Sequence, residues 1–232
     1  MSESIVIPQR FRGPEASANG GYTCGTLAEL VGADVVEVTL RKPPPLDVAM
    51  AVERDGETVR MTYGGEVIAE ARDGVLDLEP PSAVDFAEAK TLSDERGDDR
   101  HHPFPGCFVC GPLGDGFRLR PTPLGEGRVV APWHVAAEFA AMRFAWAALD
   151  CPGGWAVQPD GSRGISVLGR LTARMHSTPK AGDECVVVGW PLGEPEGRKL
   201  HAGTAVYRDG TLLALGRAVW FTVDDAVGDT AR

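Results

Sequence analysis

The chain has 232 residues, of which 43% are hydrophobic and 24% charged, ordinary values for a folded protein large enough to build a core without disulfide or metal staples. Its 33 Asp and Glu residues against 23 Lys and Arg residues give a formal charge of −10, which argues against a nucleic-acid partner because such proteins concentrate positive charge. No apolar run approaches the roughly 20 residues that span a bilayer, the first residues lack a signal-peptide core, and the five cysteines are sparse, so we expect reduced thiols, no membrane partner and a cytoplasmic location.

The first predicted helix covers Gly20–Val31. Asn19 is a suitable N-cap, because its side chain can accept a hydrogen bond from the first helical turn. Apolar residues share one face of the segment, and Gly32 follows it as a typical helix terminator.

A strand meander is predicted after this helix. The 29 Gly and 18 Pro residues of the chain cut it into short segments, which favours strands over long helices. Residues 54–56 and 64–65 contain the glycines that two-residue hairpin turns need. The predicted strands are Val35–Leu40, Val48–Glu53, Val59–Tyr63 and Val67–Ala71.

The segment 75–100 is interpreted as a connector. Ser82 precedes a short amphipathic pattern that predicts one helix, and the run Asp94–Arg100 is strongly charged. A solvated linker helix is the favoured interpretation.

A second helix is predicted over Glu138–Leu149. Its apolar residues recur at steps of three and four, which is the mark of a helix packed on a sheet: Phe139, Met142, Ala145, Trp146 and Leu149. The segment is apolar on nearly all sides, so we expect strands to wrap around it.

A second meander follows, with strands at Ile165–Met175, Glu184–Trp190, Lys199–Tyr207 and Thr211–Val223. The order of strands, Pro-containing loop and Gly turns repeats that of the first meander, which indicates an internal duplication. Residues 224–232 are a polar tail without predicted structure.

A helix followed by a meander, present twice, resembles the tandem (double) hotdog architecture of acyl-CoA thioesterase-like proteins. The resemblance is carried by Asn19-Gly20-Gly21-Tyr22, by Ala147-Ala148-Leu149-Asp150 and by Gly154-Trp155-Ala156. In that family the helix opens with a Gly-Gly element and an acidic residue follows about two turns later, where Glu29 and Asp150 stand here. The segment HHPFPGCFVCGP resembles a thioesterase-like subgroup.

The resemblance implies an α+β fold, a double hotdog with two antiparallel sheets, each wrapped around a long buried helix. It implies an N-terminal hotdog at residues 1–80, a linker with a Cys-x2-Cys knuckle at 81–112, and a C-terminal hotdog at 113–224.

Thioester hydrolysis needs a donor to the carbonyl oxygen and a carboxylate that attacks or activates water. The backbone amides of Gly20 and Gly21, at a helix N-terminus, are the predicted donors, and glycine allows a thioester to approach the backbone closely. Asp150 is the predicted carboxylate, since an apolar setting disfavours its charged form and prepares a general base.

Blander interpretations stay open for these residues. Gly20-Gly21 can be a simple turn into a helix, and Asp150 can be a buried acid that accepts hydrogen bonds near the break at residues 152–154. Glu29 is a weaker candidate for the carboxylate. The second half lacks a Gly-Gly element, so we predict one productive site per chain, with Gly21 facing Asp150.

Five further residues are predicted to contact substrate: Asn19, Tyr22, Trp146, Trp155 and Arg174. Thr172, Arg174 and His176 share one strand face by alternation, and they either line an acyl or pantetheine path or form a solvent-facing row.

The segment His101-His102-x4-Cys107-x2-Cys110 has the spacing of zinc ligands, but a second Cys or His pair is missing. A redox role lacks the strand–helix–strand context that accompanies such chemistry. The favoured interpretation is therefore a structural knuckle that packs Phe104 and Phe108, with no metal. Cys151 has no adjacent His or Asn partner and is a poor nucleophile candidate.

These observations predict a thioesterase-like protein that hydrolyses an acyl-CoA or carrier-linked acyl thioester. The alternative is a non-catalytic hotdog protein that binds an acyl-CoA or a hydrophobic small molecule. A hydratase of the hotdog type is disfavoured, because no His follows Asp150 at the required spacing. No cofactor is implied, since CoA would be a substrate, and dimerisation through exposed sheet edges stays open.

Overall fold

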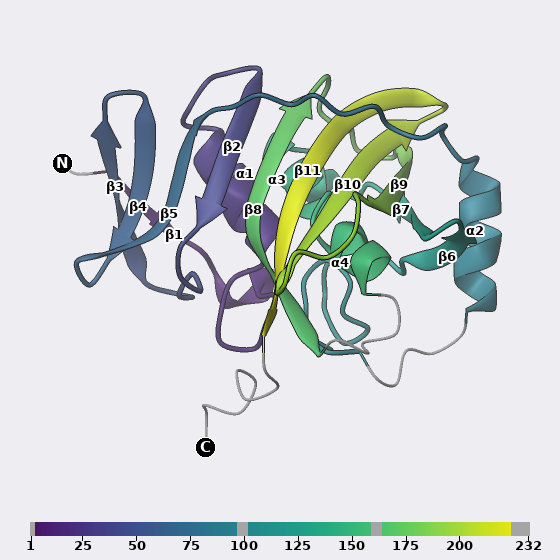
Figure 1. Ribbon diagram of the computed structural model, residues 1–232, viewed down its shortest axis with the longest axis horizontal. Coiled ribbons are helices and arrows are strands. Elements are labelled where there is room, and N and C mark those ends of the chain that lie inside the picture. Colours follow the sequence, from purple (N-terminus) through teal and green to yellow (C-terminus); the bar gives the residue numbers. More distant parts are fainter. Residues whose placement is uncertain (1–2, 97–101, 159–163, 224–232) are drawn as a thin grey trace.

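A single antiparallel sheet forms the framework of the protein (Figure 1). The computed structural model describes residues 3–96, 102–158 and 164–223. Within these residues, eleven strands are hydrogen-bonded in the order β1-β3-β4-β5-β2-β8-β11-β10-β9-β7-β6. His101, the residues 97–100 of the charged run and the tail 224–232 lie outside the described residues.

The first half of the chain forms one end of this sheet, with five strands, and contributes one α-helix. Strand β2 has the predicted bounds, and the other three predicted strands shift by one or two residues at their ends. Gly64 and Gly65 have φ of 59° and 80°, the left-handed conformations that a tight turn between β4 and β5 requires. The elements are β1 (Ser4–Val6), α1 (Gly20–Ala28), β2 (Val35–Leu40), β3 (Ala49–Asp55), β4 (Thr58–Tyr63) and β5 (Glu66–Asp73).

The second half adds six strands. The positions of the four predicted strands are confirmed within one residue. Asp209 and Gly210, both with positive φ, make the predicted turn between β10 and β11. The strands are β6 (Thr122–Gly125), β7 (Arg128–His134), β8 (Ile165–Met175), β9 (Glu184–Pro191), β10 (Lys199–Arg208) and β11 (Thr211–Val223).

The two expected long helices are shorter than predicted. Helix α1 ends at Ala28. The predicted segment Glu138–Leu149 holds η2 (Ala137–Phe139) and α3 (Met142–Ala148), and α4 (Cys151–Val157) follows beyond it. The break between α3 and α4 lies just before Pro152, which has no N–H to bond to the carbonyl of the preceding turn. The prediction of one helix over Glu138–Leu149 was wrong at its start, where residues 140–141 separate η2 from α3, whereas its end at Leu149 matches the C-cap of α3.

The two meanders share one sheet because β2 pairs with β8. Val36 lies opposite Ala173 and Val38 opposite Leu171, in antiparallel register. The expectation of two separate sheets is corrected by this pairing. The order outward from the seam, β2-β5-β4-β3-β1 on one side and β8-β11-β10-β9-β7 on the other, is the same in both halves.

Helices or the connector cover both faces of the sheet around strands β8 to β7. Helices α1, α3 and α4 lie on one face, in the main core. The connector after β5 crosses the other face to helix α2 (Phe86–Glu95), which is capped by Asp85 (Figure 1). Ala89 of α2 is fully buried in a second cluster with Val130 and Val186, so the connector packs on the sheet and is not merely solvated. In the described part of the chain, no helix has the length and apolar character needed to cross a bilayer.

Candidate functional site

The N-terminus of α1 meets the break between α3 and α4. Asn19 caps α1, since its Oδ1 accepts a hydrogen bond of 2.8 Å from the Tyr22 amide. Its Nδ2 donates to Oδ2 of Asp150 at 2.9 Å, and the Gly21 amide donates to the same oxygen at 2.8 Å. The predicted helix tip of the first half and the predicted acid of the second half are thus in direct contact.

Glycine at position 21 is required for the packing of α1 on α3. A Cβ there would lie 2.5 Å from the Cβ of Asp150 and 2.6 Å from the carbonyl oxygen of Trp146. A Cβ on Gly25, one turn later, would lie 2.7 Å from the Cα of Arg143. The missing Cβ of Gly21 therefore admits the neighbouring helix, whereas the sequence suggested that it admits a substrate.

Asp150 is a buried carboxyl group, 3% exposed. Its Oδ1 has no hydrogen-bond partner among the described residues. Burial raises the pKa of Asp150 to about 7, against the lowering effect of the hydrogen bonds from Gly21 and Asn19. A carboxyl group with a pKa near neutrality suits general-base chemistry.

Glu29 occupies the corresponding place at the other end of the helix pair. Its carboxylate accepts a hydrogen bond of 3.2 Å from the Arg143 amide at the start of α3 and pairs with the Arg143 guanidinium at 2.7 Å. This acid is neutralised by a cation, whereas within the described residues no cation pairs with Asp150. Each acid therefore contacts the N-terminus of the other helix, but only the charge of Glu29 is balanced by a cation.

Three other predicted binding residues, Tyr22, Trp146 and Trp155, lie on the same face of the sheet as this contact. Tyr22 stacks on Phe11 with ring centroids 4.2 Å apart, within a buried aromatic cluster. Trp146 lies on α3 and is 1% exposed, and its backbone carbonyl faces Gly21. Trp155, on α4, is half-buried with its ring 5.4 Å from that of His102.

Arg174 lies on the other face of the sheet. It pairs in register with Val35 and Leu215, whose side chains belong to the cluster under the connector. Directly paired residues of neighbouring strands point to the same face. The structure therefore does not bring Arg174 to Asp150, and Thr172, on the same face, contacts Glu37 instead.

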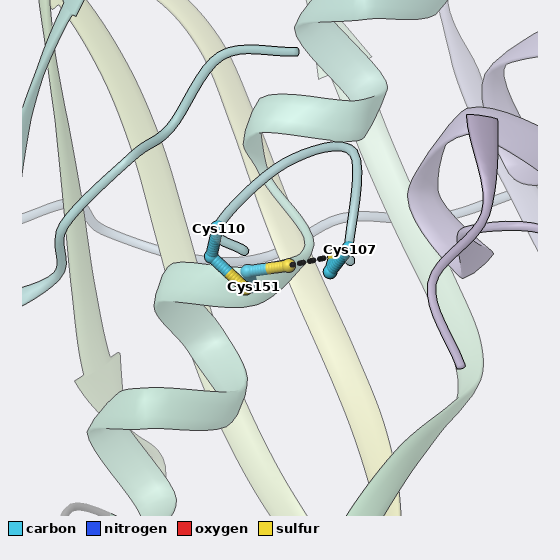
Figure 2. Close-up of side chains that lie close together, drawn as sticks. All are labelled: Cys107, Cys110 and Cys151. Atoms are coloured by element: carbon cyan, nitrogen blue, oxygen red, sulfur yellow. Dashed lines mark hydrogen bonds between the residues drawn. The ribbon is translucent and has the colours of Figure 1, made fainter. Parts of the chain in front are cut away.

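The cysteines are the part of the site that sequence reasoning missed. Cys151, at the start of α4, joins Cys107 and Cys110 in one buried cluster (Figure 2). The Sγ atoms of Cys107 and Cys151 are 3.8 Å apart, although the residues are 44 positions apart in the chain. Hydrogen bonds from the Cys110 and Cys151 thiols hold the pKa of Cys107 well below its usual range. The one sequence signal was that Cys151 directly follows the predicted acid.

The predicted packing of the knuckle is present at Phe108, which is fully buried. Its ring contacts Phe11 at 4.9 Å in an edge-on arrangement, and its amide donates to the Arg12 carbonyl at 2.8 Å. Phe104 packs against the core while partly exposed. The knuckle thus closes over the junction of the two halves, beside Asp150.

Solved structures of one fold align with nearly the full length of the chain. A candidate thioesterase from Novosphingobium aromaticivorans aligns with a TM-score of 0.62 at 14% identity, over 95% of this chain and 94% of its own. The tesB protein of Mycobacterium avium subspecies paratuberculosis aligns with a TM-score of 0.59 at 14% identity, over 90% and 89%.

A protein of unknown function with a hot dog fold from Alicyclobacillus acidocaldarius aligns with a TM-score of 0.58 at 14% identity, over 94% of this chain and 91% of its own. A scan against family models and a search of curated proteins gave no match. The architecture, together with these alignments over nearly the full chain, shows that this protein has the hotdog fold.

Proposed function

We propose that the protein hydrolyses acyl thioesters, of CoA or of a carrier protein, at the contact between Asp150 and the N-terminus of α1. The observation that carries the proposal is the 2.8 Å hydrogen bond from the Gly21 amide to Asp150. It joins a helix N-terminus of one half to an acid of the other half, and the second oxygen of that acid has no partner among the described residues.

The chemistry follows from the two groups. The N-terminus of α1 carries partial positive charge, and among the described residues the Gly20 amide has no acceptor, so it is the donor available to the thioester carbonyl oxygen. Asp150 takes a proton from water while the water oxygen bonds to the carbonyl carbon. The C–S bond then breaks, and Asp150 returns the proton to the leaving thiolate. Asn19 holds the carboxylate in place through its Nδ2.

The organisation of the chain supports the proposal. In this interpretation residues 1–80 and 113–224 are fused, duplicated hotdog units, joined by a linker at 81–112, and the same strand order outward from the seam supports the duplication. The helix start with Gly-Gly occurs only in the first unit. At the equivalent helix start of the second unit, α3, the charge of the acid Glu29 is balanced by Arg143. One productive site per chain is the consequence.

The names of two structural neighbours are consistent with this chemistry. The Novosphingobium protein is a candidate thioesterase, and a protein from Lactobacillus plantarum with a TM-score of 0.57 at 12% identity is a candidate oleoyl thioesterase. At these identities the alignments support the fold, and the site itself supports the activity.

The test is release of free thiol from a panel of short- to long-chain acyl-CoAs. Asp150→Asn keeps an acceptor for Gly21 and Asn19 but cannot take a proton, so we expect a loss of about 100-fold or more in kcat/KM. Glu29→Gln is the matched control, because it alters the equivalent acid and leaves Asp150 intact; we expect activity within about threefold of wild type when both variants are folded.

Two outcomes would overturn the proposal. If Asp150→Asn hydrolyses the panel as fast as wild type, Asp150 has no catalytic role. If wild type binds an acyl-CoA that is recovered intact, with no thiol released, the protein is the non-catalytic ligand-binding hotdog protein considered above.

A further inference from the structure

Three cysteine side chains from two distant segments converge beside Asn19 (Figure 2). Cys107 and Cys110 come from the knuckle and Cys151 from the start of α4, and all three sulfurs lie within 4.8 Å of one another. Tetrahedral zinc with Zn–S bonds of about 2.3 Å separates its sulfur ligands by roughly 3.8 Å. The Sγ atoms of Cys107 and Cys151 are 3.8 Å apart, which is this spacing.

From this arrangement, we propose that Cys107, Cys110 and Cys151 bind one thiophilic divalent cation, for which Zn²⁺ is the expected ion. Three thiolates select soft or borderline ions and disfavour Mg²⁺ and Ca²⁺, which take oxygen ligands. Three protein ligands leave the fourth tetrahedral position for water or another small ligand.

The knuckle has a fixed shape that presents its two sulfurs together. The Gly111 amide donates to the Cys107 carbonyl at 2.9 Å and closes the turn. A Cβ on Gly111 would lie 2.4 Å from both the Cys107 amide nitrogen and the Pro105 carbonyl oxygen, so the turn requires glycine. The Leu119 amide donates to the Val109 carbonyl at 2.8 Å and anchors the turn to the following segment. The site therefore needs little rearrangement to accept an ion.

A hydrogen-bond donor lies beside the sulfur cluster. Asn19 Nδ2 lies 3.9 Å from the Cys107 sulfur and 4.0 Å from that of Cys151. Hydrogen-bond donors next to the ligand atoms commonly hold the ligands of a metal site in orientation. Asn19, which the sequence predicted to contact substrate, would therefore orient two of the sulfur ligands.

The other two cysteines provide an internal comparison. Cys24 and Cys185 are also buried thiols, but neither belongs to the cluster. Burial alone therefore does not distinguish the three cysteines; their convergence does. A site of this kind also fastens the knuckle to α4 and so stabilises the cover over the junction of the two halves.

The experiment measures metal in full-length protein purified under reducing conditions without chelator. Elemental analysis should find about one Zn²⁺ per chain, and Co²⁺-substituted protein should show the intense visible bands of a tetrahedral thiolate site. Cys151→Ala and Cys110→Ala should each retain less than about a tenth of the wild-type metal after dialysis. Cys185→Ala is the matched control, and it should keep the full metal content.

A second measurement keeps the test decisive if a knuckle variant folds poorly. Added Zn²⁺ should raise the Tm of chelator-treated wild-type protein and of Cys185→Ala, because an ion that binds only the folded state stabilises it. The proposal fails if reduced wild type binds neither Zn²⁺ nor Co²⁺, or if its Tm does not respond to Zn²⁺. It also fails if Cys185→Ala loses as much metal as Cys151→Ala.

Discussion

At the scale of single residues, Asp150 is an ionisable group that the fold buries. The same short apolar segment that predicts a helix places this carboxyl at the helix break, 3% exposed and held by Gly21 and Asn19. Burial raises its pKa to about 7, so ionising it in the folded protein costs free energy.

The stability of the protein should therefore depend on the ionisation of Asp150. Its folded-state pKa, about 7, lies above the unfolded value of about 3.9, so its favourable contribution is present below about pH 4 and is lost as pH rises through 7. In chelator-treated protein at pH 8, Asp150→Asn should raise the free energy of unfolding by roughly 1–3 kcal/mol, since the amide carries no charge to bury.

Urea denaturation of both proteins at pH 5 and pH 8 checks this prediction. The gain should shrink at pH 5, where the wild-type carboxyl is mostly protonated in the folded state. Equal differences at the two pH values would show that Asp150 does not titrate in this range. If Asp150→Asn gains stability and loses activity, the wild-type protein keeps a carboxyl group that lowers its free energy of unfolding and is needed for activity.

At the scale of elements, the contact between α1 and α3 determines the position of the site. Two glycines one turn apart, Gly21 and Gly25, let the helices approach, and each helix N-terminus receives an acid from the end of the other. The acids lie near the positive ends of the helix dipoles, where negative charge is favourable.

Substituting Gly21 separates helix propensity from packing. Alanine in a helix is favoured over glycine by up to about 1 kcal/mol, but the new Cβ would lie 2.5 Å from that of Asp150. We expect Gly21→Ala to destabilise the protein by about 1–3 kcal/mol, because overpacking outweighs propensity. The measurement is equilibrium urea unfolding.

Gly20→Ala is the control for this substitution. Its Cβ would meet side-chain atoms of Leu168 and Leu40 at 3.0–3.2 Å rather than a backbone, so the neighbours have more room to adjust. The effect should be smaller than that of Gly21→Ala. A stabilised Gly21→Ala would show that α1 and α3 are less closely packed than described here.

At the scale of the whole molecule, the two halves are joined through β2 and β8 and through α1 and α3. Such a continuous sheet and common core should unfold as one cooperative unit. Leu171, on β8 opposite Val38, is fully buried at this seam. Leu171→Ala should cost about 2–5 kcal/mol, the usual range for a fully buried leucine.

The tryptophans make cooperativity measurable. All five lie in the second half, so their fluorescence reports that half, whereas far-UV circular dichroism reports the whole chain; they are Trp133, Trp146, Trp155, Trp190 and Trp220. Both probes should give coincident unfolding transitions in wild type, and both should shift equally in Leu171→Ala. Leu113→Ala, at a residue 78% exposed, should leave them unchanged. Transitions that separate would show that the halves unfold independently.

Local patterns in the sequence predicted the strands of both meanders, the glycine turns and the cap at Asn19. These features depend on neighbours in the chain: alternation, β-branched residues and the positive φ that glycine tolerates. The predicted helix over Glu138–Leu149 was too long at its start, since η2, the break at residues 140–141 and α3 differ little in composition. The resemblance to the hotdog family added the fold, which the comparisons support.

The sequence, through its resemblance to the hotdog family, singled out Asp150, Gly20 and Gly21, because residue type and local position carry that resemblance. The resemblance to the hotdog family also predicted that Gly21 faces Asp150, and the structure brings the two into contact. Only the tertiary structure decided that Arg174 faces away from Asp150 and that Cys151 lies with Cys107 and Cys110. The physical reason is distance along the chain: these contacts join segments 44 and 129 residues apart. Such contacts are set by how the sheet closes at the seam and how the helices pack on it, which no local spacing encodes.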